Sequence, residues 1–246
     1  MTAPRLHPRR RRTTIVVLAA CGAALVLGVA AVAFGPAIYR DVIVGAAPPA
    51  PSLSPGAPPA AGASDATAVP LTDLSGSWHA SPGSYAGYRV DEVLNGTDVT
   101  VVGRTETVTA EIHVDGLAVT DALITVDVAS IATDEPARDG YFRDTALRVS
   151  EHPTATFRLT EPLRAERAPA AGQTATVEVA GELTVRGVTR AATAEMQSAF
   201  DGRTVQVAGS IPITFADYGV EAPNLGFVSV EPEGFVEFLL VLDKVS

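Results

Sequence analysis

The sequence predicts an all-β domain over residues 71–246, built either as a closed antiparallel barrel or as a sandwich. Apolar and polar residues alternate with a period of two in successive stretches of this region, as they do in strands with one buried face. Turn-forming pairs such as Asn95-Gly96 separate the stretches. No convincing helical pattern of ten residues occurs here. About eight strands on a domain of this length imply a barrel or a sandwich.

Each predicted strand has apolar residues at every second position, on one face. These positions are Val108, Ala110, Ile112 and Val114 in 106–116; Ala122, Ile124, Val126 and Val128 in 121–130; Val177, Val179, Gly181, Leu183 and Val185 in 175–187; and Val205, Val207, Ile211, Ile213 and Phe215 in 204–215. The stretch 234–244 is apolar on both faces, so we expect it to be well buried. One short helical turn is expected within 139–149. Gly181 and Gly209 are of the kind that lets a barrel strand bend, and an eight-stranded barrel can hold one elongated apolar ligand.

The N-terminal residues predict a membrane-spanning segment. Arginines are frequent in residues 1–12, and no charged residue occurs in 13–39. An apolar helix of about 20 residues spans a bilayer, and the preceding arginines favour the cytoplasmic side. We therefore expect a basic cytoplasmic tail (1–12), a transmembrane signal-anchor helix (13–39) and an extracytoplasmic domain at the cell membrane. The alternatives are cleavage after the Ala-Val-Ala site at 31–33, which would secrete the domain, and lipid attachment at Cys21.

Residues 40–70 are expected to form a linker between this helix and the β domain. Proline, alanine, glycine and serine dominate the stretch and no periodicity is present, so it cannot bury a core of its own. In a polyproline conformation, at about 3 Å per residue, the linker could hold the domain up to about 70 Å from the membrane.

Charge and cysteine content exclude several classes of function. Residues 66–246 carry 12 basic and 26 acidic side chains, so the phosphate backbone of nucleic acids would repel this part of the chain. Cys21 is the single cysteine, which excludes an intrachain disulfide and a cysteine-based zinc site. The histidines do not recur at metal-ligand spacing, and motifs such as G-x-S-x-G and the P-loop are absent. We therefore expect no metal, no cofactor and no enzymatic activity.

The segment 137–157 is rich in charged residues and has two competing interpretations. In the first, the segment is a latch, in which ion pairs and an apolar underside that includes Phe142 hold a loop against the rest of the domain. In the second, a hydrolase or isomerase would use four polar side chains of this segment: Arg138, Asp139, Asp144 and His152. We favour the latch.

Several motifs resemble those of YceI-like proteins, over about residues 74–243. The stretch GELTVRGVTR (181–190) is similar to the strand-turn-strand signature of that family, and ITFADYGV (213–220) is similar to the segment before its last strands. The middle segment of the family is matched, in order, by Ser130-Ile131, Arg138-Asp139, His152-Pro153 and Phe157. One departure is the stretch 87–105, which lacks the histidine that many members carry near the first hairpin.

The resemblance implies an extended, lipocalin-like antiparallel barrel of eight strands over 71–246. It also implies that the interior binds a long apolar chain such as a polyisoprenoid, without catalysis. The alternative is a ligand-free structural or interaction barrel of the cell envelope. Aromatic side chains near the barrel mouth and at one end are the expected ligand contacts: Phe142, Phe157, Phe215, Tyr218 and Phe227 near the mouth, and Trp78 at the end.

Overall fold

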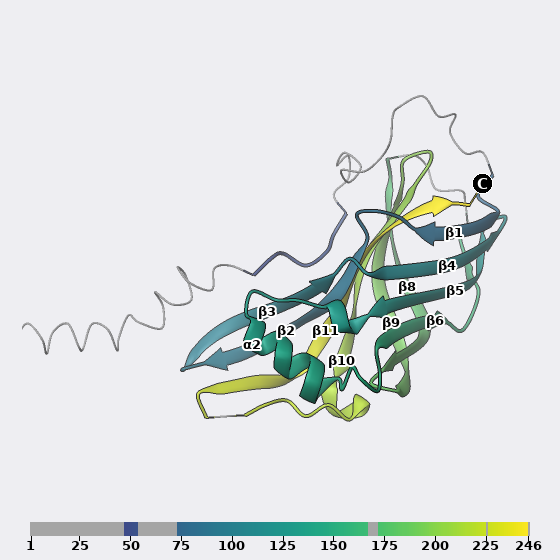
Figure 1. Ribbon diagram of the computed structural model, residues 1–246. Coiled ribbons are helices and arrows are strands. Elements are labelled where there is room, and N and C mark those ends of the chain that lie inside the picture. Colours follow the sequence, from purple (N-terminus) through teal and green to yellow (C-terminus); the bar gives the residue numbers. More distant parts are fainter. Residues whose placement is uncertain (1–46, 54–72, 167–171, 225, 246) are drawn as a thin grey trace, which may run out of the picture. The chain divides into compact units, whose positions relative to one another are not determined.

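The computed structural model describes residues 47–53, 73–166, 172–224 and 226–245 (Figure 1). Within this part of the chain, 47–94 and 98–245 belong to one compact unit. The predicted cytoplasmic tail and signal-anchor helix, 1–39, lie outside the described residues, as does most of the predicted linker. None of the helices in the described ranges has the length and the apolar character needed to cross a membrane.

The described residues form one antiparallel sheet with short helical segments between some of its strands. The strands are β1 (Gly76–Ala80), β2 (Tyr85–Leu94), β3 (Thr97–Thr105), β4 (Val108–Asp115), β5 (Ala118–Asp127), β6 (Thr154–Leu159), β7 (Leu163–Arg164), β8 (Thr174–Val185), β9 (Val188–Phe200), β10 (Val205–Thr214) and β11 (Val228–Lys244). The helical segments are the 3-10 helices η2 (Val128–Ser130) and η4 (Phe215–Tyr218), the α-helix α2 (Pro136–Tyr141) and the π-helix η3 (Phe142–Ala146).

Eight of these strands close into a barrel. The neighbours follow the order β1, β4, β5, β6, β8, β9, β10 and β11, and β11 pairs with β1 to complete the ring. Strand β11 is long enough to pair with β2 over Val228–Leu239 and then with β1 over Leu242–Lys244. Strand β3 lies outside the ring beside β2, and β7 pairs with β5. The predicted all-β, closed eight-stranded antiparallel barrel is therefore confirmed.

The period-two alternation predicted which side chains face the barrel interior. Burial in β4 alternates strictly from Val108 to Ile112, and the apolar side chains predicted to face inward in 121–130, 175–187 and 204–215 belong to the apolar core, with one exception. Phe215 was expected on the inward face of a strand, but β10 ends at Thr214 and Phe215 begins η4. The tight turns are confirmed as well, since Asn95 and Gly96 have φ values of 50° and 78°, and Arg186 and Gly187 have 52° and 73°. Positive φ at both central residues is the requirement of a type I′ hairpin turn.

Gly181 and Gly209 allow a close approach between neighbouring strands. A Cβ at Gly181 would overlap the ring of Phe157, and a Cβ at Gly209 would lie 2.7 Å from the Cβ of Met196. Both glycines therefore bring strands or side chains closer together than any other residue would allow.

Two expectations for the chain need correction. The short helical turn expected within 139–149 begins earlier, at Pro136 of α2, because Glu135 caps this helix and Pro136 occupies its first turn. The stretch 234–244 is not buried on both faces throughout. Leu240 and Leu242 are buried, whereas Phe235 is 44% exposed because its outward side chain borders an open groove.

Candidate functional site

The inner wall of the barrel is apolar and carries many small residues. We define the inner wall as the inward-facing side chains of the eight ring strands and of β2. Its alanine and glycine positions include Ala80, Ala86, Ala110, Ala122, Ala155, Gly181, Ala192, Ala194 and Gly209. The interior of an eight-stranded barrel is just wide enough to be filled by large side chains or to hold one small ligand. Small side chains at so many positions favour space for a ligand.

Larger residues of the inner wall remain half-buried in the middle of the sheet. Phe157 lies between Ile124 and Leu183 on the neighbouring strands, and Phe238 lies between Gly209 and Ala86. Both phenylalanines keep part of their surface exposed although they pack against the buried core. Paired strands flank both residues, so their neighbours in the sheet do not fully cover either ring.

The helical segment α2–η3 packs against the inward-facing side of β2 and the neighbouring β3. The ring of Phe142 stacks on the ring of Tyr88, with centroids 4.7 Å apart and an interplanar angle of 16°. Ile131 and Leu147, on either side of the helical segment in sequence, are buried in the same core. A Cβ at Gly103 would lie only 2.5 Å from the Tyr88 ring, so this glycine makes room for the stack. The apolar underside of the latch is therefore built around Tyr88.

Ion pairs and hydrogen bonds hold the polar side of the same segment. Arg138 donates to Glu92 of β2 at 3.2 Å and to Asp134 at 2.9 Å, and Glu92 is only 6% exposed. Asp139 accepts hydrogen bonds from the amide and the hydroxyl of Thr133, at 2.9 and 2.7 Å. These contacts fix α2 to β2 and to the loop that precedes the helix, which is the arrangement the latch interpretation expects.

Three other polar residues of the segment, Arg148, Glu151 and His152, also make local contacts. Arg148 pairs with Glu151 on the surface. The ring of His152 lies beside Gly187 in the turn between β8 and β9. Of the four residues in the catalytic hypothesis, Arg138 and Asp139 thus make contacts that fasten the segment, and His152 lies against a hairpin turn.

Burial of Tyr88 predicts a dependence of stability on alkaline pH. Burial raises the pKa of the Tyr88 phenol above its ordinary value of about 10, and the nearby Arg138 opposes the shift. The folded protein then keeps the proton that the unfolded chain loses, so the free energy of unfolding should fall as the pH rises above about 10. We expect Tyr88→Phe to reduce this fall, measured by denaturant unfolding at pH 8 and pH 11. An unchanged difference between the two pH values would contradict the assignment.

The structure gathers four of the six predicted aromatic residues in one apolar cluster. Trp78 is 2% exposed on β1, and its indole nitrogen donates to the Leu74 carbonyl at 2.9 Å. Phe142 and Phe157 are half-buried members of the same cluster, and Tyr218 on η4 is 4% exposed. Trp78 therefore serves as a core residue of the barrel, whereas Phe157 is placed on the inner wall.

The remaining two aromatic residues lie apart from this cluster. Phe215 opens η4, and its ring packs where a side chain at Gly234 would otherwise lie. Phe227 precedes β11 and is 57% exposed. Tyr88 and Phe238 were not among the predicted site residues. Tyr88 was missed because its stack with Phe142 depends on the position of the helical segment. Phe238 was missed because its strand is apolar on both faces, so the alternation of apolar and polar residues does not show which way its side chain points.

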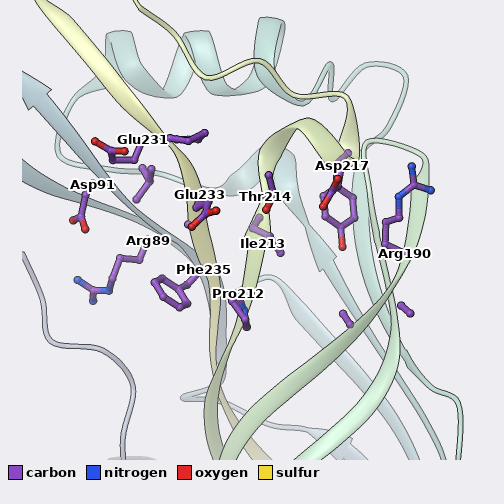
Figure 2. Close-up of a pocket in the computed structure, with 16 residues that line it drawn as sticks. Arg89, Asp91, Arg190, Pro212, Ile213, Thr214, Asp217, Glu231, Glu233 and Phe235 are labelled. Atoms are coloured by element: carbon purple, nitrogen blue, oxygen red, sulfur yellow. The ribbon is translucent and has the colours of Figure 1, made fainter.

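A groove of about 620 Å³ lies where β9 and β10 separate (Figure 2). Pairing between the two strands ends at Ser210 and Glu195, and η4 contacts both strands beyond this point. Acidic and basic side chains line the groove around apolar ones: Arg89, Asp91, Arg190, Asp217, Glu231 and Glu233 around Ile213, Tyr218 and Phe235. Figure 2 shows Arg190 beside Asp217 on one side of Thr214, and Arg89 with Asp91 on the other. The groove therefore suits a molecule with polar and apolar parts.

In the described ranges, no three or more histidine, cysteine, aspartate or glutamate side chains come together in a way that could hold a metal ion.

Comparison with known proteins identifies the fold of the domain. The YceI-like domain model matches residues 79–242. The chain is similar to the structure of a polyisoprenoid binding domain from Saccharophagus degradans implicated in plant cell wall breakdown, with 19% identity and a TM-score of 0.58 over 70% of this chain and 99% of that one. This likeness shows a shared fold.

Two further solved structures are similar at lower scores. BcnA from Burkholderia cenocepacia has 24% identity and a TM-score of 0.48, over 63% of this chain and 95% of its own. The YCEI protein of Campylobacter jejuni has 17% identity and a TM-score of 0.42, over 56% of this chain and 83% of its own. No curated protein sequence matches the chain.

Proposed function

The chain belongs to the YceI-like domain family, and on this premise we propose that its barrel binds a polyisoprenoid or a similar long apolar chain in its interior, without catalysing a reaction. The observation that carries the proposal is the inner wall, where Phe157 and Phe238 stay half-buried between paired strands and many neighbouring positions are alanine or glycine. The similar structure from Saccharophagus degradans, described as a polyisoprenoid binding domain, supports the same ligand class.

Apolar burial alone can supply the affinity for such a ligand. Each methylene group removed from water contributes about 0.8 kcal/mol, so ten of them contribute about 8 kcal/mol before the cost of ordering the chain. The apolar underside of the latch, with Phe142 on Tyr88, would continue the apolar surface at the covered end of the barrel.

We also propose that the domain works outside the cytoplasm at the cell membrane, tethered by residues 13–39. The support is the uncharged stretch that follows the arginines of residues 1–12. Secretion after cleavage near 31–33 is the alternative. Fractionation of cells that express the full chain with a C-terminal tag distinguishes the two, because a tethered chain stays with the membranes and a cleaved one is released.

Native mass spectrometry of the full chain, purified in detergent from a bacterial host, tests ligand binding. We expect protein that carries an extra mass which organic solvent extracts as an isoprenoid or a similar lipid. Protein that is ligand-free from every membrane-containing host would instead support the alternative, a ligand-free structural or interaction barrel.

Filling the interior should displace the ligand. Ala155 faces inward from β6 opposite Val126, and its neighbour Thr154 faces outward and is exposed. We expect Ala155→Phe to raise the Kd for the ligand about tenfold, which corresponds to a loss of about 1.4 kcal/mol in binding. Thr154→Phe places the same ring on the other face of the strand and should leave the Kd unchanged. Equal effects of the two substitutions would place the ligand outside the interior.

A further inference from the structure

A proline-rich segment, residues 47–53, lies against the outer face of the barrel. Arg89 of β2 donates to the Pro48 carbonyl at 2.7 Å, and Arg104 of β3 donates to the Pro49 carbonyl at 3.1 Å. The Leu53 amide donates to the side-chain carbonyl of Gln197 on β9 at 2.7 Å. The consecutive strands β2 and β3, together with β9 much later in the chain, therefore hold a segment of seven residues.

The two arginines are fixed in place before they reach the segment. The Arg89 guanidinium pairs with Glu237, which is 1% exposed, and Arg104 lies 3.7 Å from the same carboxylate. The Arg104 guanidinium also lies over the Tyr85 ring, 4.6 Å from its centroid. Donors that are already oriented lose little freedom when they bind an acceptor, so this arrangement favours docking of the segment.

All three hydrogen bonds reach backbone atoms of the segment. Such contacts recognise the conformation of a chain more than its side chains. Three of the seven residues are proline, and proline fixes its own φ near −65° while it biases the preceding residue to an extended conformation. The segment is thus biased toward the polyproline conformation, whose carbonyls are unpaired and open to donors.

We propose that the outer face formed by Arg89, Arg104 and Gln197 is a docking surface for an extended, proline-rich segment, and that residues 47–53 of the same chain occupy it. The folded domain then begins at Ala47, and only residues 40–46 of the predicted linker are left as a spacer between the predicted helix and the domain. This role is separate from ligand binding in the interior, because the surface lies on the opposite face of the sheet.

The sequence contains a second copy of the docked motif. Ala-Pro-Pro-Ala occurs at 47–50 and again at 57–60. Because the docking contacts reach backbone atoms, the second copy offers the same chemistry, and it supplies a matched control for the first.

The exchange rate of the Leu53 amide hydrogen in the full chain, measured by NMR, tests the proposal. Replacing Pro48 and Pro49 with alanine keeps both acceptor carbonyls but removes the conformational bias, so we expect exchange about tenfold faster. The same double change at Pro58 and Pro59 should leave the rate unchanged. Gln197→Ala should accelerate exchange, whereas Glu195→Ala, at an exposed position on the same strand, should not.

Three results would overturn the proposal. The first is a Leu53 amide that exchanges in the wild-type chain as fast as in an unstructured peptide. The second is equal acceleration by the two double proline variants. The third is protection that grows with protein concentration, since that would show docking between two chains.

Discussion

Arg89→Leu is expected to lower the free energy of unfolding by about 3 kcal/mol. Glu237 is 1% exposed and pairs with Arg89. When Arg89 is replaced, the buried carboxylate of Glu237 keeps only Arg104 as a partner, at 3.7 Å. Breaking a buried ion pair by removal of one partner typically costs about 3–5 kcal/mol, and the second arginine places this case at the lower end. Denaturant unfolding monitored by circular dichroism gives the measurement.

Two further variants separate this effect from a general loss of charge. Arg158 pairs with Asp121 at 3.5 Å, and both side chains are 51% exposed, so Arg158→Leu should cost less than about 1 kcal/mol. Adding Glu237→Leu to Arg89→Leu removes the buried carboxylate that has lost its closer partner and should restore part of the lost stability. If Arg89→Leu cost no more than Arg158→Leu, the buried pair would not have the role assigned to it.

Gly87→Ala is expected to destabilise the barrel by about 3 kcal/mol or to prevent β2 and β3 from pairing. A Cβ at this position would overlap the carbonyl oxygen of Gly103 and lie 2.9 Å from the Cα of Arg104. Both atoms belong to the backbone, so no side chain can rotate away, and overpacking of this kind costs about 1–3 kcal/mol or more. The midpoint of thermal unfolding and the circular dichroism spectrum measure the change.

Gly140→Ala provides a control with the opposite sign. Gly140 lies in α2 and a Cβ there meets no atom within 4 Å. Alanine is favoured over glycine inside a helix by about 0.5–1 kcal/mol, so this variant should be more stable than the wild type. Similar effects of the two glycine substitutions would show that close backbone approach at Gly87 does not limit the fold.

The strands that the sequence predicted well have an apolar residue at every second position and a tight turn beside them. Strands β4, β5, β8 and β10 meet this condition, and their inward faces were assigned correctly. Strand β9 is harder to assign because Arg190 and Ser198 stand on its inward face while alanines occupy both faces. The alternation is weak wherever small or polar residues line the interior.

The aromatic ligand contacts were chosen by residue type and by position in the chain, and they stay a prediction. In the structure Phe157 lies on the inner wall, Trp78 is buried in the core and Phe227 is exposed. The docking surface could not be predicted, because it depends on Glu237, whose partner Arg89 is 148 residues away in sequence. Within an apolar stretch, nothing local indicates that a carboxylate will be buried on the outer face.

Strand β11 determines when the barrel can form during synthesis. It follows every other strand of the ring in the chain, yet it lies between β10 on one side and β1 and β2 on the other. Until β11 has emerged, β1 and β10 each present an unpaired edge that can join another chain. Strand β1 therefore cannot complete its pairing until β11 has been synthesised. The growing chain consequently needs protection from aggregation while almost the whole domain is made.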